Sequence, residues 1–326
     1  HSCGLLSASF QPDKFTRKLR AYMRHRKNLI EMSAKHIRMM HKALEQMNIK
    51  IQHVIADITG KSGQEIIKSI IAGERNAEIL ASCCDSRIRA HKKEGIIKSL
   101  TGVWKEEHVF ELEQSYSIYQ FYHAKLKECD AKIEEHLREK SGVDTFVEPQ
   151  KKEKSNKNNL NFNGKEMLYE LTGTDLAEIF GITETNAIEI ISEVGLDMSK
   201  WPTVKHFTSW LNLAPNNKIS GGKVLSSRIP KKKNHAGQIF RMAAFAIQRS
   251  KNWLAMFYNR IKAKNGAPKA IVATARKIAA IFYKMVKERV KFNPIPIEKY
   301  MDGFKENQIK KLKRQAKNLG LQIVEM

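Results

Sequence analysis

The stretch IEMSAKHIRMMHKALEQMNIKIQHVIADI, residues 30–58, decides the fold of the first half of the chain. Its apolar residues alternate between steps of three and four after one step of seven: Ile30, Ile37, Met40, Leu44, Met47, Ile51, Val54 and Ile58. Such spacing is typical of the seam of a coiled coil, where apolar positions recur every 3.5 residues on average. We therefore predict a helix that starts at Pro12 and Asp13 and is ended by Gly60 and Gly63.

A second seam predicts another long helix over residues 106–139. Its members are Leu112, Tyr119, Tyr122, Leu126, Cys129 and Ile133. The segment between the two seams is mixed and indicates short helices. Two interpretations stay open: an antiparallel helical hairpin that also pairs between subunits, and a plain helical bundle. The seams indicate helix packing and carry no chemistry.

The domain organisation follows from changes in composition. Residues 1–11 are a short apolar leader, and residues 12–140 form the helical coiled-coil region. Residues 141–165 are rich in Lys and Asn and poor in apolar residues, which is typical of a linker. We expect an all-α C-terminal domain over residues 166–291 and a basic tail helix over residues 292–326, so the fold class is mainly α.

The charge of the chain indicates a polyanionic partner. Its 326 residues carry a formal net charge of +24, and no Asp or Glu occurs from Ser199 to Lys287, although Lys and Arg recur there. A solvated surface normally mixes both signs. Nucleic acid is the partner that this excess favours, because Lys and Arg neutralise phosphates and release counterions.

The four cysteines, Cys3, Cys83, Cys84 and Cys129, form no CxxC pair and no zinc-like cluster. We expect free thiols in a reducing compartment. The sequence shows no signal peptide, and its longest apolar run is interrupted by Arg276, Lys277 and Lys284.

The segment DLAEIFGITETNAIEIISEVG, Asp175 to Gly195, predicts a helix, a glycine turn and a second helix. This pattern is similar to a helix-hairpin-helix, whose turn offers backbone N–H groups to a DNA phosphate without reading sequence. Thr183 stands where a second turn glycine is usual, so simple packing is the alternative. Beyond it we expect helices over residues 235–264, with an apolar face that includes Ile239, Met242, Phe245 and Ile247, and over residues 269–290.

The loop NNKISGGKVLSSRIPKKK, residues 216–233, has three interpretations. The sequence excludes a nucleotide-binding Walker A loop, because Val224 follows Lys223 at the position where Ser or Thr must hold magnesium. A phosphate-binding turn would use Gly221 and Gly222 for close backbone approach. In the third, Ser220 is a nucleophile that a cationic field activates. The candidate DNA-binding residues of this region are Lys218, Gly221, Gly222, Lys223, Arg228, Lys231, Lys232, Lys233 and Arg241.

Three runs of the sequence resemble one family in order and spacing. These are LAEIFGITETNAIEIISEVG, FTSWLNLAPNNKISGGK and the run from GQIFRMAAFAIQRS to KAIVATARKIAAIFYKMV. They resemble the C-terminal domain of the DEDD-type insertion-sequence transposases (the IS one-ten, IS one-sixteen and IS nine-oh-two class, also described as bridge-RNA-guided recombinases). The resemblance covers about residues 168–290, and residues 13–139 resemble the coiled-coil segment of that family.

The resemblance implies a mobile-element enzyme with a composite active site. In the family an N-terminal RNase H-like domain carries four acidic metal ligands, and the C-terminal domain carries a serine that forms a covalent phosphoserine with DNA. Ser220 matches that serine. Residues 1–11 look like the remnant of the acidic domain, so the resemblance implies a fragment that is catalytically incomplete alone and binds no Mg²⁺ itself, with Mg²⁺ held by the missing domain.

The resemblance also implies the partners: DNA, a guide (bridge) RNA and further copies of the chain through the coiled coil, in the prokaryotic cytoplasm and without a membrane. From the residues alone, a rival stays open: a non-enzymatic, basic helix-hairpin-helix module that only binds nucleic acid. We assign no metal role to Asp57, Asp85 or Asp130, because no matching motif surrounds them.

Overall fold

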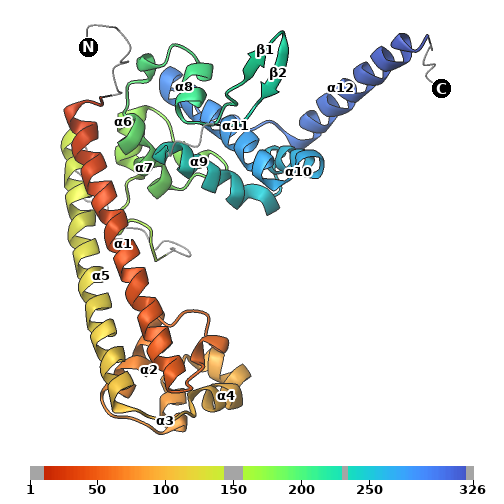
Figure 1. Ribbon diagram of the computed structural model, residues 1–326. Coiled ribbons are helices and arrows are strands. Elements are labelled where there is room, and N and C mark those ends of the chain that lie inside the picture. The colour runs from red at the N-terminus through yellow and green to blue at the C-terminus, as the bar shows by residue number, and fades with distance from the viewer. Residues whose placement is uncertain (1–10, 143–156, 230–233, 321–326) are drawn as a thin grey trace. The chain divides into compact units, whose positions relative to one another are not determined.

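The computed structural model describes residues 11–142, 157–229 and 234–320 (Figure 1). The expectations for residues 1–10, the central part of the linker, Lys231 to Lys233 and residues 321–326 lie outside the described residues. Helices dominate, which confirms the mainly α prediction. The chain divides into two compact units: a larger unit of residues 1–20, 135–152 and 163–326, and a smaller unit of residues 21–134 and 153–162.

The smaller unit contains most of two long helices, α1 (Lys14–Gln46) and α5 (Glu106–Ser141). Between them lie η1 (Ile51–His53), α2 (Lys61–Ile71), α3 (Ala77–Ser82) and α4 (Ser86–Leu100). Within this unit α1 and α5 run antiparallel (Figure 1): the Tyr22 carbonyl accepts a hydrogen bond from Cys129, while further along α1 the His36 ring contacts the Tyr122 ring in a tilted arrangement. The bounds of α5 agree with the helix predicted for residues 106–139.

The first helix is shorter than predicted. It ends at Gln46, because Asn48 adopts a left-handed φ of 59° and the Ile49 N–H donates to the Leu44 carbonyl at 2.9 Å. This is a Schellman-type C-terminus, at which asparagine is one of the few residues that tolerate the left-handed conformation. The later seam residues Met47, Ile51 and Ile58 are still buried, but in the compact cluster formed with α2 and α4.

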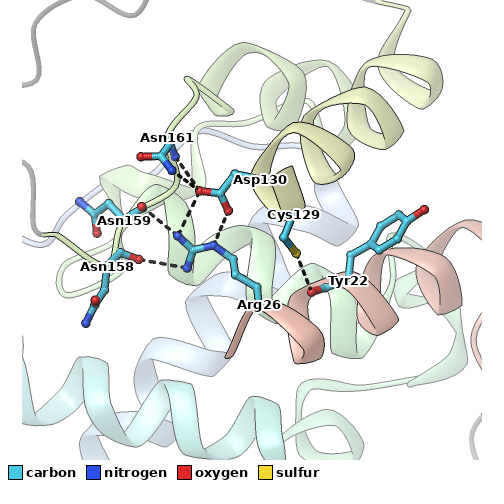
Figure 2. A network of polar contacts seen from close by, with 7 residues as sticks. All are labelled: Tyr22, Arg26, Cys129, Asp130, Asn158, Asn159 and Asn161. Carbon is cyan, nitrogen blue, oxygen red and sulfur yellow. Dashed lines mark hydrogen bonds and ion pairs between the residues drawn. The ribbon is translucent and has the colours of Figure 1, made fainter. Parts of the chain in front are cut away.

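The seam of α1 also contains polar positions. Arg26 is buried one turn before Ile30, and Ser33 is buried in the seven-residue gap between Ile30 and Ile37. Arg26 is 5% exposed and its partner on α5, Asp130, is 1% exposed. Their side chains meet at 2.5 Å between Nε and Oδ1 (Figure 2).

This ion pair is completed by residues 158–161, which belong to the segment predicted as a linker. Arg26 also donates to the carbonyls of Asn158 and Asn159, at 3.0 and 2.9 Å, and Asp130 accepts from the backbone and side chain of Asn161, at 3.1 and 2.8 Å (Figure 2). A buried charge pair is tolerated only when its remaining donors and acceptors are satisfied. The network therefore fastens residues 158–161 to both long helices.

The larger unit is an assembly of helices with one small sheet. Its elements are α6 (Lys165–Thr172), η2 (Leu176–Glu178), α7 (Glu184–Val194), η3 (Met198–Lys200), α8 (Val204–Trp210), β1 (Lys218–Ser220), β2 (Lys223–Ser226), α9 (His235–Ala246), η4 (Ile247–Arg249), α10 (Trp253–Asn265), α11 (Ala267–Glu288) and α12 (Ile297–Asn318). Helix α11 packs against α8, α9 and α10. Phe207, Phe240 and Phe282 join these helices, with ring centroids 5.5–6.5 Å apart.

Two expectations for this unit need correction. The helix predicted over residues 235–264 is broken before α10, where the Asn252 side chain accepts from the Ala255 N–H at 2.9 Å and caps a new helix. Met242 and Phe245 are 59% and 57% exposed, because α9 buries the side that carries Ile239, Phe240 and Ala243. The tail helix is observed as α12, which has no buried residue.

None of the helices in the described part of the chain combines the length and the apolarity that crossing a membrane requires.

Candidate nucleic-acid interface

The loop predicted around Ser220 is a β-hairpin. Strands β1 and β2 pair antiparallel, with Ser220 opposite Lys223, Ile219 opposite Val224 and Lys218 opposite Ser226. The pair is joined by Gly221 and Gly222, whose φ angles are 54° and 74°. Two successive left-handed residues make the type I′ turn that suits the twist of a hairpin, and glycine adopts it at no steric cost. The "Ser220 hairpin" below means residues 216–228.

Ser220 lies next to the tip of this hairpin and is exposed. Residues directly opposite each other in an antiparallel pair place their side chains on the same face, with Cβ atoms about 4.5–5.5 Å apart. The register therefore puts the Ser220 hydroxyl beside the Lys223 side chain. The opposite face of the hairpin carries Ile219 and Val224, which are also exposed.

The two ends of the hairpin are fixed to the helical core. Asn234 donates from Nδ2 to the Trp210 carbonyl at 2.9 Å and accepts from the Gly237 N–H at 2.8 Å, so one side chain joins the end of α8 to the start of α9. A Cβ on Gly237 would lie 2.1 Å from the Leu211 carbonyl oxygen, so only glycine fits this approach. The core holds the base of the hairpin while its tip extends outward (Figure 1).

The other candidate residues are distributed along the hairpin. Lys218 is exposed on β1, opposite Ser226. Arg228 is exposed at the base, where its carbonyl accepts from the Asn216 N–H at 3.1 Å. Arg241 is half-buried and donates to the Asn212 carbonyl at 2.7 Å, and burial lowers its pKa. This contact stabilises the turn before β1. Arg241 therefore helps to position the hairpin.

Residues 173–259, which contain the whole Ser220 hairpin, match the model of the Transposase IS116/IS110/IS902 family. This part of the chain is similar to that transposase family. A comparison with curated proteins gave no match.

The transposase segment includes the turn between η2 and α7, where the sequence is similar to a helix-hairpin-helix. The first expected helix is only the 3₁₀ turn η2. Gly181, with φ of 83°, packs so closely on α9 that a Cβ would lie 2.6 Å from the Ala243 carbonyl oxygen. At the start of α7 the Thr183 side chain accepts from Asn186, and the Glu184 carboxylate accepts from the Gly164 N–H. This turn therefore packs against other elements of the larger unit.

A second basic feature of the larger unit lies below the hairpin. A cavity of about 550 Å³, called the α10–α11 pocket below, is formed by α10, by α11 and by the segments that lead into and out of the hairpin. Its lining includes Lys269, Arg276 and Lys277, together with Phe257, Val272 and Ala273. Sequence reasoning identified none of these as a site. The absence of acidic residues from 199 to 287 was the signal that could have found them.

One cation of this pocket, Lys277, lies against aromatic rings, and so does Arg260 of α10, which is outside the lining. The Lys277 ammonium lies 4.8 Å from the Phe257 ring centroid and 5.6 Å from that of Trp253, and Arg260 lies 5.4 Å from Phe257. Burial, followed by the charges of Arg260 and Arg276, lowers the pKa of Lys277. Among the described residues, no ion pair with an acidic residue is seen at Lys269, Arg276 or Lys277, which are exposed.

The described residues contain no group of three or more His, Cys, Asp or Glu that could hold a metal ion. The three aspartates considered from sequence have other contacts. Asp130 pairs with Arg26, Asp85 caps α4 through the Arg87 N–H, and Asp57 accepts from Thr59 and Lys157.

Proposed function

We propose that this chain binds DNA with its larger unit and cuts and rejoins it through Ser220, as part of DNA transposition by an insertion sequence. The observation that carries the proposal is the place of Ser220 within the transposase-family segment. It is exposed beside a Gly-Gly turn and directly opposite Lys223. A nucleophile on a DNA phosphate requires this combination of access and positive charge.

In the proposed step the Ser220 Oγ attacks the phosphorus of a phosphodiester. The new Oγ–phosphorus bond forms as the bond from phosphorus to the leaving sugar oxygen breaks. The hydroxyl proton passes to a base, and the leaving oxygen takes up a proton. The product is a covalent phosphoserine, and attack by a different strand's hydroxyl on this phosphorus would rejoin the DNA and release Ser220.

Lys223 is the residue placed to stabilise the charge that develops on the attacked phosphate, because its side chain shares a face with Ser220. Arg228 pairs with Asn216, four residues before Ser220, which is about 13 Å along an extended strand. We therefore assign Arg228 to a neighbouring phosphate, where it would position the DNA. Lys218 supplies charge between these two points.

The residues around Ser220 do not fit a magnesium ion, since hard cations take oxygen ligands and residues 199–287 contain no carboxylate. The step above uses none. We propose that Mg²⁺, where the complete enzyme requires it, is held by an acidic domain like that of the resembling family.

Two partners belong to the same proposal: a guide RNA that selects the DNA, and further copies of the chain that pair through α1 and α5. Exposed apolar residues on these helices support the second, among them Met32 and Met39 on α1 and Phe110 and Phe121 on α5. A monomer by sedimentation would contradict the pairing, and DNA selection unchanged without RNA would contradict the guide.

The deciding experiment traps the covalent intermediate. The protein that joins this chain to the RNase H-like domain is incubated with its element's DNA and guide RNA, and adducts are resolved on a denaturing gel. Ser220→Ala should abolish the adduct. Ser226→Ala is the matched control, because Ser226 lies on the same hairpin and also faces a lysine, Lys218. Adduct that persists in Ser220→Ala would refute the nucleophile. DNA binding with no adduct in the unsubstituted protein would favour the non-enzymatic binding module.

A further inference from the structure

The α10–α11 pocket has a composition that suits a nucleotide. Its volume of about 550 Å³ lies within the range of about 300–1,000 Å³ that is usual for small-molecule sites. The apolar and aromatic surfaces of Phe257, Val272 and Ala273 offer contacts to the face of a base, and Lys269, Arg276 and Lys277 offer charge to a phosphate. An apolar metabolite would leave the three cations without a counter-charge.

The position of the pocket connects it to the strand that Ser220 is proposed to attack. The same cavity is lined by Pro215, which precedes the hairpin, by Ser227 near the end of the hairpin, and by Ile229, which follows it. Ser220 is five residues from Pro215, so the two are separated by at most about 17 Å along an extended strand. This length corresponds to roughly five nucleotides of one B-form strand. One DNA strand could therefore contact the Ser220 hairpin and the pocket together.

The charges of the pocket favour a strand over a free, weakly charged ligand. Lys277 is held close to Phe257 and Trp253, and burial followed by the charges of Arg260 and Arg276 lowers its pKa. A phosphate of a bound strand would supply a negative charge, while its base occupies the apolar part beside Phe257. Proteins that hold an unstacked base combine the same two parts, an aromatic or apolar surface and a cationic path for the backbone.

We propose that the α10–α11 pocket binds one unstacked nucleotide of the DNA strand that Ser220 attacks. The inference rests on the proposed function for the identity of that strand. Phe257 stacks on the base, and Lys269 and Arg276 bind the phosphates on either side of it. The pocket thereby holds the strand in place while the hairpin presents Ser220 to a phosphate nearby.

The test measures whether binding depends on a base. The probes are a 15-nucleotide single-stranded DNA with 2-aminopurine at its centre, the same DNA with an abasic site there, and the RNA of the same sequence. Affinity is measured by anisotropy, and stacking by quenching of the 2-aminopurine fluorescence. The base-containing DNA should bind at least about fivefold more tightly than the abasic DNA, because stacking on one aromatic side chain contributes about 1–3 kcal/mol.

Ala273→Phe fills the pocket without changing charge and should remove this preference. Ala263→Phe is the matched control, because Ala263 is an exposed residue of α10 outside the pocket lining, and it should keep the preference. Phe257→Leu keeps apolar volume and should lose the quenching, so the test does not depend on one variant folding. Circular dichroism checks the fold of each.

Equal affinity of the unsubstituted protein for base-containing and abasic DNA would overturn the proposal, and so would a preference that survives in Ala273→Phe. Tighter binding of the RNA than of the base-containing DNA would also overturn it, since the occupant would then be RNA. Ser220→Ala should bind all three probes as the unsubstituted protein does. Different measurements therefore distinguish the two proposals: base preference in the binding assay tests the pocket, and the Ser220-dependent covalent adduct tests the nucleophile.

Discussion

Removing the carboxylate of Asp130 should destabilise the smaller unit more than removing any exposed acid on the same helix. In Asp130→Ala, Arg26 stays buried and keeps only the carbonyls of Asn158 and Asn159 as partners. An uncompensated buried charge costs about 3–5 kcal/mol. With a urea m-value of about 2 kcal/mol/M, the midpoint of unfolding should fall by roughly 2 M.

The control is Glu128→Ala, which removes an acid two residues away on α5. Glu128 pairs with Lys125 at 2.9 Å, but both side chains are exposed, so the loss should stay below about 1 kcal/mol. The double variant Arg26→Met with Asp130→Leu should lose less stability than Asp130→Ala alone, because it removes both buried charges and fills their volume.

Urea unfolding followed by circular dichroism gives the midpoints, and hydrogen exchange of peptides from α1 and α5 locates the effect. Exchange should increase at Arg26, along both helices and at residues 158–161. If Asp130→Ala and Glu128→Ala have midpoints that agree within about 0.5 M, Arg26 is not held as a buried charge and the reasoning is wrong.

Three further predictions concern acid stability, salt and the turn. Burial, then the charges of Lys127 and Lys157, lowers the pKa of His123 below 6.5, so the contribution of His123 to stability is present above about pH 6.5 and is lost as the pH falls through the folded-state pKa. His123→Gln should therefore make the urea midpoint fall less between pH 7 and pH 5. An unchanged pH dependence of the midpoint would contradict this. Lys269→Ala should reduce the slope of log affinity for DNA against log salt by about 1, and a flat salt response of the unsubstituted protein would count against phosphate binding. Gly221→Val should reduce the yield of the covalent adduct and Gly221→Asn should preserve it, because asparagine tolerates a φ near 54° and valine does not. Equal adduct yields in the two variants would show that the turn geometry is not required.

Local patterns in the sequence were sufficient to predict that the fold is helical. The seam spacing predicted α5 nearly to its bounds, because the apolar period of an amphipathic helix is a local property. The same spacing predicted a first helix that is too long, because the apolar pattern continues past Asn48 whereas the helical backbone ends before it. Packing into the compact cluster buries Met47, Ile51 and Ile58 without a continuous helix.

The sequence by itself determined that this is a basic, mainly helical chain with an acid-free half, and it singled out Ser220 beside two glycines. Composition and short-range pattern carry that information directly. Only the tertiary structure decided that Ser220 and Lys223 share one face of a hairpin, that Arg26 and Asp130 pair although 104 residues separate them, and that Phe257, Lys269 and Arg276 line one cavity. These relations depend on which helix faces pack together, and residue spacing along the chain does not specify that packing.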